Sequence, residues 1–486
     1  MKLIVKHKFK LALLLILVIA YFALRLPNLT LQPIFADEAI YIRWAQVMRS
    51  EPTLRFLPLS DGKTPLFMWT MIPLFKIFED PLFAGRFLSV VSGFTTFLGV
   101  FVLSWKIFNV RVALWAGLLY VIVPYTVFFD RMALTDSMLS AFTVWSVYFA
   151  IWLAQKVRLD LAFILGFILG GGWLTKTPAV LNLLLLPVTI LVFKRIKKDK
   201  VALLKLFLFW AVAILIALAA YNALRLGPNF HLLSSRNADY IFSPLELIGR
   251  PLDPFIPHLR DMADWFPKLL TWPILIAGFI GIIRGKNRLG WVVLLWMLLP
   301  LLLSMAFLRT FTARYLLPSI PLFLILAGFG AEKISQKIKP VILVVLLIIL
   351  PLQFNYQLLT NPPPNSLPQE ERKGYFEQWT AGYGFKEIAR FLIEQKKGLP
   401  AGRQVVVGTE GFFGTLPDGL YIYLDKAGIA VVPSTATISA KLKEAALGHQ
   451  TYFVGNRSSL ENIGGVILIK EFPKIGSDAT VLYQIR

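Results

Sequence analysis

Long apolar runs alternate with short polar segments along the first 357 residues of the chain. A membrane-spanning helix needs about 20 predominantly apolar residues, with a usual range of about 17–25. Most of the runs reach or approach this length and contain few charged side chains, which favours spanning helices. The pattern predicts an all-α polytopic membrane protein with about eleven transmembrane helices. The runs lie near 11–27, 87–105, 112–129, 137–155, 160–175, 178–193, 201–224, 266–283, 290–307, 315–331 and 340–357.

The segment between the first two predicted spans, residues 28–86, has a different pattern. Residues 38–49 place Ala39, Ile42 and Ala45 at helical spacing among polar side chains. This arrangement is typical of a helix that lies in the membrane interface. The apolar run 66–78 is too short to cross a bilayer. We therefore expect interfacial or re-entrant helices in this first outer loop.

The pattern changes again after residue 357. Residues 358–374 are rich in proline and polar side chains, which is typical of a linker. Residues 386–395 then form an amphipathic helical pattern, and five short segments rich in β-branched and aromatic residues follow it. We expect three parts: a transmembrane domain over 1–357, a linker over 358–374 and a small α/β domain over 375–486. The predicted strands fall at 403–409, 428–433, 451–455, 465–472 and 480–486.

Composition supports the membrane interpretation. The chain is 57% hydrophobic and 16% charged, whereas a soluble chain is about 45–50% apolar and about 25% charged. The absence of cysteine excludes disulfides, thiolate metal sites and a cysteine nucleophile.

The net charge of +22 raises the question of a nucleic-acid partner. If the predicted spans alternate in direction, the N-terminus and the even-numbered connections share one side. That side carries nineteen basic residues and three acidic ones, which is the bias of cytoplasmic loops. The charge therefore indicates topology rather than nucleic-acid binding. We expect a multi-pass protein of the cytoplasmic (plasma) membrane with its N-terminus inside and its C-terminal domain outside.

Acidic side chains near lipid often mark functional sites. Asp37 and Glu38 follow the first span, and Asp136 lies in the short outer hairpin between the third and fourth spans. Each also has an ordinary structural interpretation, because Asp37 or Asp136 could cap the helix that follows it.

Basic residues at predicted outer helix ends form a second group of candidates. Each alone could reach up to lipid headgroups, but several in one cavity would bind a phosphate. Tyr315, Trp44 and Trp69 are aromatic candidates for stacking on a sugar. The basic candidates are Lys63, Arg86, Arg131, Lys176, Arg236 and Arg314.

These motifs, taken in order, resemble the C-type polyprenyl-phosphate-sugar-dependent glycosyltransferases, particularly protein O-mannosyltransferases and lipid A aminoarabinose transferases. The resemblance covers about residues 10–335. Gly62 and Thr64 depart from the pattern of the aminoarabinose enzymes. The segments that carry the resemblance are Asp37-Glu38-Ala39-Ile40-Tyr41, Lys63-Thr64-Pro65-Leu66 with Trp69, Arg86-Phe87-Leu88-Ser89, Leu134-Thr135-Asp136 with Leu139, Leu174-Thr175-Lys176-Thr177-Pro178 and Arg314-Tyr315-Leu316-Leu317-Pro318.

The resemblance implies transfer of a sugar from a polyprenyl-phosphate carrier to an acceptor hydroxyl on the outer face, with inversion. It implies Asp37 as general base, with Glu38 and Asp136 assisting. The basic candidates and Tyr315 would then bind the substrate. A divalent cation held by Asp37, Glu38 and Asp136 is compatible with their carboxylate ligands. The alternatives are a lipid or polysaccharide flippase, for which we find no repeated halves, and a non-catalytic scaffold.

Overall fold

The computed structural model describes residues 2–193, 199–250, 252–285, 287–400, 402–460 and 464–486. The chain divides into two compact units, and each is described by itself. The first unit comprises residues 1–27, 55–67 and 87–368, and the second comprises 28–54, 68–86 and 369–486.

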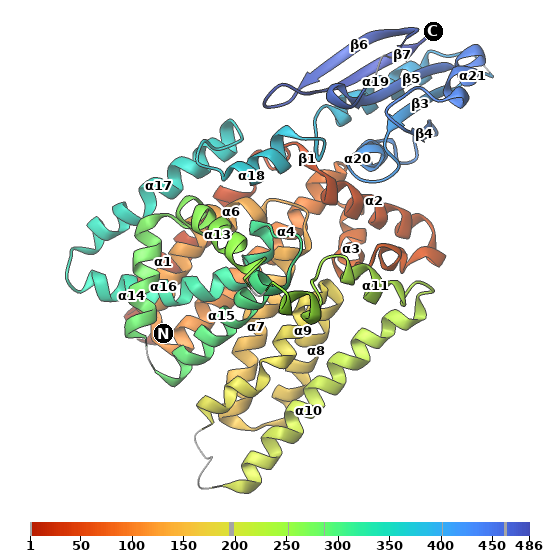
Figure 1. Cartoon of the computed structure of the whole chain (residues 1–486). Coiled ribbons are helices and arrows are strands. Elements are labelled where there is room, and N and C mark those ends of the chain that lie inside the picture. Colours follow the sequence, from red (N-terminus) through yellow and green to blue (C-terminus); the bar gives the residue numbers. More distant parts are fainter. Residues whose placement is uncertain (1, 194–198, 251, 286, 401, 461–463) are drawn as a thin grey trace. The chain divides into compact units, whose positions relative to one another are not determined.

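The first unit is helical, and each of the eleven predicted apolar runs contains a helix (Figure 1). Three runs are broken: 112–129 forms α5 and α6, 178–193 forms α9 between 3-10 turns, and 266–283 contains the end of α13 and most of α14. Its helices are α1 (Lys2–Arg25), α5 (Val110–Ile122), α6 (Pro124–Asp130), α7 (Thr135–Lys156), α8 (Leu159–Thr175), α9 (Val180–Leu184), α10 (Lys200–Asn222), α11 (Leu232–Ala238), α12 (Pro244–Ile248), α13 (Phe255–Leu269), α14 (Trp272–Arg284), α15 (Arg288–Phe307), α16 (Ile320–Ser335) and α17 (Pro340–Thr360), with α3 (Leu66–Met71) and α4 (Pro81–Ile107) shared between the units.

Length and composition support a polytopic membrane protein. Among the described residues, six helices are long and apolar enough to cross a membrane, or up to eight if each of two bent helix pairs is one span. The bent pairs are α5 with α6, at 58°, and α13 with α14, at 112°. The predicted class is confirmed, and the count of eleven spans stays a prediction.

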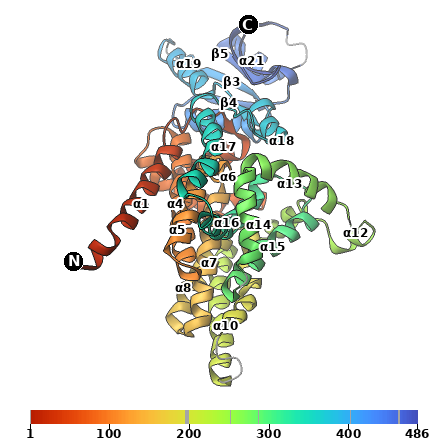
Figure 2. The same cartoon turned by 90° about the vertical axis from the view of Figure 1, so that its left-hand side faces the viewer.

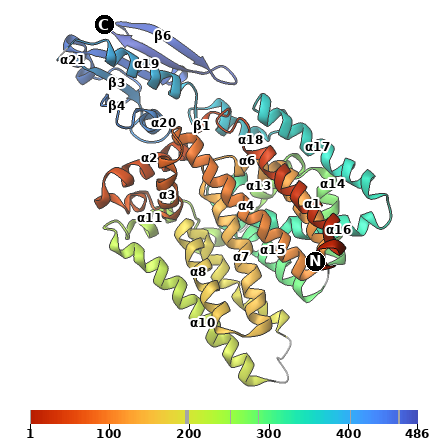
Figure 3. The ribbon, with the colours of Figure 1, turned by 180° about the vertical axis from the view of Figure 1, so that it is seen from behind.

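Small residues allow close helix packing in the first unit. α14 lies beside α16 (Figure 2), and a Cβ on Gly281 would stand 1.9 Å from the carbonyl oxygen of Leu326. A Cβ on Gly330 would stand 1.8 Å from the carbonyl oxygen of Ala277. Only glycine fits at these two positions, which is how membrane helices approach each other closely. On another side of the unit α1 lies beside α4 (Figure 3), where the Tyr21 and Phe94 rings are 5.5 Å apart.

The bend between α5 and α6 follows from Pro124, which has no N–H and leaves carbonyl groups of the preceding turn without helical partners. Side chains from distant helices supply the missing donors. Arg25 Nη2 donates to the carbonyl of Tyr120 at 3.2 Å and Arg25 Nη1 to that of Val121 at 3.0 Å. Asn355 on α17 donates to the carbonyl of Ile122 at 2.7 Å. The break is therefore hydrogen-bonded within the protein, as lipid surroundings require.

The second unit contains a five-stranded mixed sheet with strand order β4-β3-β5-β7-β6. β3 pairs in parallel with β4 and β5, and β7 pairs antiparallel with β5 and β6. All five predicted strands and the predicted helix 386–395 are confirmed. The elements are β3 (Val405–Glu410), β4 (Ala430–Ser434), β5 (Gln450–Asn456), β6 (Val466–Pro473), β7 (Ala479–Ile485), α18 (Gln369–Arg372), α19 (Phe385–Lys397), α20 (Thr415–Leu424) and α21 (Ala440–Gly448).

The second unit also includes most of the first outer loop. β1 (Ile34–Phe35) pairs antiparallel with β2 (Ala381–Gly382). α2 (Ala36–Ser50) packs against α20, where Gln46 donates to the carbonyl of Ile422 at 2.9 Å. Arg49 pairs with Asp425 at 2.7 Å. The tail thus packs with the segment that carries Asp37 and Glu38, while the predicted domain boundaries stay predictions.

Candidate active site

Arg86 and Glu38 form a fully buried ion pair in the second unit. Arg86 Nε donates to Glu38 Oε1 and Nη2 donates to Oε2, both at 2.8 Å. The remaining N–H groups of Arg86 reach three backbone carbonyls, so all five donors of the guanidinium group are used. This arrangement favours a positioning role for Arg86 at the loop before α2, and substrate binding by Arg86 stays a prediction. The carbonyls belong to Leu29, Gln32 and Pro33, at 2.9–3.1 Å.

Asp37 lies in the first turn of α2, beside this ion pair in sequence. The capping interpretation of Asp37 is wrong, because the helix begins at Ala36 and Phe35 is the N-cap residue. The terminal turn is instead closed by Glu38 Oε2, which accepts a hydrogen bond from the Phe35 amide at 3.0 Å. The Asp37 side chain is half-buried. A carboxylate in the first turn is stabilised by the positive end of the helix dipole.

Asp136 and Lys176 form the central ion pair of the first unit. Lys176 Nζ lies 2.6 Å from Asp136 Oδ1, and the exposed fraction is 23% for the Lys176 side chain and 4% for the Asp136 side chain. Lys176 Nζ also lies 4.4 Å from the centre of the Tyr315 ring, and the Arg314 guanidinium lies 5.2 Å from that centre. The capping interpretation of Asp136 is also wrong, because Leu134 is the N-cap residue of α7. Four predicted residues therefore meet in one cluster.

Lys63 and Arg236 each take part in a contact between residues 61–63 and the loop after α10. Lys63 Nζ lies 3.4 Å from the Tyr240 hydroxyl group and 4.5 Å from the centre of that ring. Arg236 pairs with Asp61 at 3.1 Å and is half-exposed. Gly62 between Asp61 and Lys63 has φ = +67°, and a Cβ there would meet the Arg236 Cβ at 2.5 Å. The departure at Gly62 thus has a local steric cause.

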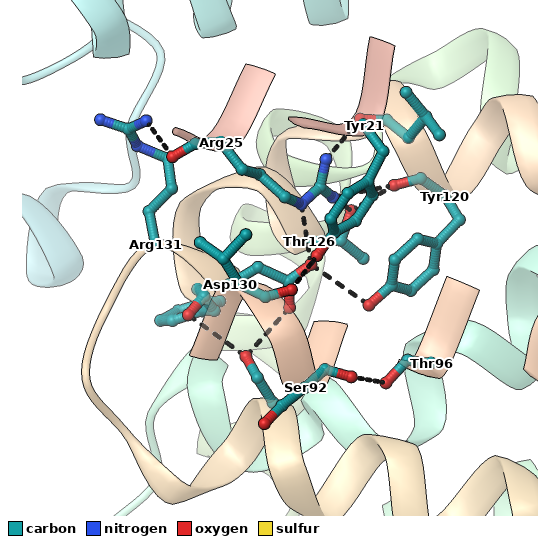
Figure 4. Close-up of polar contacts among 12 residues, drawn as sticks. Tyr21, Arg25, Ser92, Thr96, Tyr120, Thr126, Asp130 and Arg131 are labelled. Carbon is teal, nitrogen blue, oxygen red and sulfur yellow. Dashed lines mark hydrogen bonds and ion pairs between the residues drawn. The ribbon is translucent and has the colours of Figure 1, made fainter. Parts of the chain in front are cut away.

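Arg131, the C-cap residue of α6, is buried beside the end of α1. Its Nη1 donates to the carbonyls of Arg25 and Pro27 at 2.7 and 2.9 Å. Arg25 itself pairs with Asp130 at 3.0 Å, as Figure 4 shows. These contacts satisfy carbonyl groups that the end of α1 leaves without helical partners, and they favour a positioning role for Arg131.

The sequence pattern did not predict the ion pair between Arg25 and Asp130. Asp130 Oδ2 also accepts from the Tyr120 hydroxyl group at 3.2 Å (Figure 4), and Oδ1 accepts from the Ser137 hydroxyl group at 2.9 Å. Ser137 adjoins Asp136 on α7. A charged residue at position 25, inside an apolar run, was the available signal, because such residues seldom occur in spanning helices without a partner.

The predicted site residues are divided between the two units. Asp37, Glu38 and Arg86 belong to the second, and the other acidic and basic candidates belong to the first. That all of them line one outer vestibule stays a prediction. Trp44 is buried and its ring lies 6.0 Å from that of Phe413, while Trp69 is half-buried. Within the described ranges no three His, Asp or Glu side chains form a group that could hold a metal ion.

Comparisons with known proteins define the class of fold. Residues 62–222 match the family model described as dolichyl-phosphate-mannose-protein mannosyltransferase. This segment contains Lys63, Arg86, Arg131, Asp136 and Lys176. None of the curated proteins matches the chain.

Two solved structures share the fold. ArnT from Cupriavidus metallidurans, bound to undecaprenyl phosphate, is 14% identical with a TM-score of 0.57, and the match covers 98% of each chain. The oligosaccharyltransferase AglB from Archaeoglobus fulgidus, in complex with an inhibitory peptide and a dolichol-phosphate, is 12% identical with a TM-score of 0.51. That match covers 93% of this chain and 70% of AglB. The predicted resemblance to C-type glycosyltransferases is confirmed, and the chain has an ArnT-like fold.

Proposed function

We propose that the protein is a membrane glycosyltransferase that moves a sugar from a polyprenyl-phosphate carrier to an acceptor hydroxyl group. The family model and the shared fold support this class of reaction. The two similar structures were each solved with a polyprenyl phosphate bound, as their descriptions state. We expect transfer on the outer side of the cytoplasmic membrane, because the basic bias of the opposite loops predicts that the candidate residues face outward.

The observation that carries the proposal is the Asp136–Lys176 pair beside Tyr315. An ammonium group has three N–H donors, so Lys176 can bind a phosphate oxygen while Asp136 and Tyr315 fix its position. Negative charge grows on the phosphate as the sugar departs. A preorganised cation compensates that charge without reorganising in the transition state. Arg314, whose guanidinium group lies 5.2 Å from the centre of the Tyr315 ring, would add further positive charge. Lys63 would do the same.

Asp37 would act as the general base. The acceptor oxygen attacks the anomeric carbon, the bond from that carbon to the phosphate oxygen breaks, and Asp37 takes the hydroxyl proton. One displacement of this kind inverts the configuration at the anomeric carbon. The products are the glycosylated acceptor and the polyprenyl phosphate, which needs no general acid because phosphate is already a stable leaving group. Glu38, bound by Arg86, would orient the turn that carries Asp37.

A transfer assay tests this function. The purified protein is incubated with a panel of labelled polyprenyl-phosphate sugars and membrane extract, and mass spectrometry identifies what becomes labelled. We expect release of the polyprenyl phosphate and appearance of the sugar on a hydroxyl group. Movement of intact labelled lipid across vesicle membranes, with no donor cleaved, would instead support the flippase.

A further inference from the structure

A cavity of about 620 Å³ lies in the first unit, where the loop after α10 folds back toward the end of α15. Small-molecule sites in proteins are usually about 300–1,000 Å³. Neither the candidate catalytic residues nor the phosphate-binding candidates line it. It is therefore a separate place for a ligand of moderate size.

Three aromatic side chains line the cavity. Tyr221 at the end of α10, Phe230 and Phe242 contribute rings to it. The Tyr221 ring is held by stacking on Trp173, with ring centres 4.0 Å apart. Fixed aromatic rings offer flat apolar surfaces, and their C–H and π faces suit ligands that are apolar on one side.

Hydrogen-bonding side chains also line the cavity. Ser234 and Asn237 on α11, Ser243 and Glu246 around the start of α12, and Arg309 after α15 all line the cavity. The backbone hydrogen bond from Ser243 lowers the pKa of Glu246 below its ordinary value, so this carboxylate is ionised at neutral pH. Arg309 Nη2 donates to Glu246 Oε1 at 2.8 Å. Both donors and acceptors therefore line the cavity.

Backbone hydrogen bonds hold the two sides of the cavity together. The Phe242 amide donates to the carbonyl of Phe307, and the Arg309 amide donates to the carbonyl of Tyr240, both at 2.8 Å. Ile241 and Leu308 form a β-bridge between these bonds. The cavity is therefore shaped before any ligand enters, which lowers the entropy lost on binding.

The cavity also adjoins the cations of the proposed reaction. Thr177, which lines it, directly follows Lys176 and lies 3.5 Å from the Asn237 amide group. Tyr240, the partner of Lys63, directly precedes the lining residue Ile241. The cavity and the proposed phosphate-binding lysines therefore share the turn at Thr177 and the segment at Tyr240.

We propose that this cavity binds a sugar ring. Its aromatic rings suit the C–H face of a pyranose, and its donors and acceptors suit the hydroxyl groups at the ring edge. This inference rests on the proposed function for the source of the sugar. That source is either the donor, whose sugar extends from the phosphate, or a saccharide acceptor.

Filling the cavity tests the proposal. Ala238 lines it at the end of α11, so Ala238→Trp would occupy the space without removing a side-chain hydrogen bond. Ser235→Trp on the same helix is the control, because Ser235 is exposed and does not line the cavity; this change removes one local hydrogen bond, from the Ser235 hydroxyl group to the Leu232 carbonyl at 3.2 Å. Binding is measured for both variants and the wild type with polyprenyl phosphate, with and without its sugar. The KM for the acceptor is measured in the transfer assay.

If the donor sugar occupies the cavity, Ala238→Trp loses at least tenfold in affinity for the sugar-bearing lipid and none for the bare lipid. If an acceptor saccharide occupies it, donor binding is unchanged and the KM for the acceptor rises at least tenfold. Unchanged donor binding and unchanged acceptor KM in Ala238→Trp would overturn the proposal. Failure of the proposed function looks different, since the wild type would then cleave no donor at all.

Discussion

The Arg25 guanidinium and the Asp130 carboxylate form an ion pair 3.0 Å long in which both side chains are buried. The pair joins α1 to the end of α6, 105 positions further along the chain. Tyr120 and Ser137 bind the same carboxylate. Through Ser137 the pair reaches the first turn of α7, where Asp136 lies.

Removing one partner of this pair should destabilise the first unit strongly. Asp130→Ala leaves the buried Arg25 charge without its counter-ion, and such changes cost about 3–5 kcal/mol. Thermal unfolding in detergent measures the loss. Asp130→Asn keeps an acceptor oxygen for Arg25 and for the Tyr120 hydroxyl group, so it should lose less stability than Asp130→Ala. Equal stability of Asp130→Ala and the wild type would contradict the structural role.

The sequence pattern predicted most of the fold because its signals are local. Each apolar run formed a helix, and the alternating segments of the tail formed the five strands of its sheet. The pattern could not predict that the first outer loop packs with the C-terminal tail. The pairing of Ile34 with Gly382 joins residues 348 positions apart, and neither segment carries a local sign of the other.

The Asp136–Lys176 pair provides a test of phosphate binding. Lys176→Ala should lower kcat/KM for the donor by about 10²–10³-fold, since it removes a charge that compensates the leaving phosphate. Asp136→Asn should have a smaller effect, because the lysine remains but is less well oriented. Residues in contact couple by about 0.5–3 kcal/mol, so the double variant should lose less than the two single losses combined. Strict additivity in the transfer assay would argue against a joint role.

Arg86 gives a contrasting prediction about structure. Lysine cannot reproduce five donors in a plane, so Arg86→Lys should leave buried acceptors unpaired at about 1–3 kcal/mol each. Hydrogen exchange of the α2 amides should then increase. Arg43→Lys is the matched control, since Arg43 is one-quarter exposed and its contact to Asp425 is 3.4 Å, and partly exposed pairs contribute about 0–1 kcal/mol. Unchanged exchange in Arg86→Lys would exclude the positioning role.

Gly62 gives a prediction about the position of Lys63. Gly62→Ala places a side chain at φ = +67° and against the Arg236 Cβ. A left-handed conformation alone costs about 1–2 kcal/mol, and the clash should displace the loop that carries Lys63. We expect a lower melting temperature and weaker donor binding. Gly249→Ala is the control, because its nearest contact would be at 3.8 Å; an equal effect of both changes would refute the steric account.

The residues of the candidate site could be predicted from the sequence, but the contacts between them could not. A lysine in Thr175-Lys176-Thr177 and an acid in Thr135-Asp136 could be identified from order and spacing, yet their contact joins the end of α8 to the first turn of α7, 40 positions away. Arg86 and Arg131 looked like substrate ligands because a basic residue at a helix end has the same appearance in either role. Only their bonds to backbone carbonyls distinguish the roles, and such bonds leave no trace in the sequence.

The most direct measurement of the central claim is single-turnover transfer by Asp37→Asn with a labelled polyprenyl-phosphate sugar that the wild type uses. Asparagine keeps the size of the side chain but cannot accept the acceptor proton, and a general base contributes about 10²–10⁴-fold. We predict a rate lower by at least about 100-fold, with donor binding and melting temperature unchanged. A variant that transfers the sugar at the wild-type rate would contradict the account.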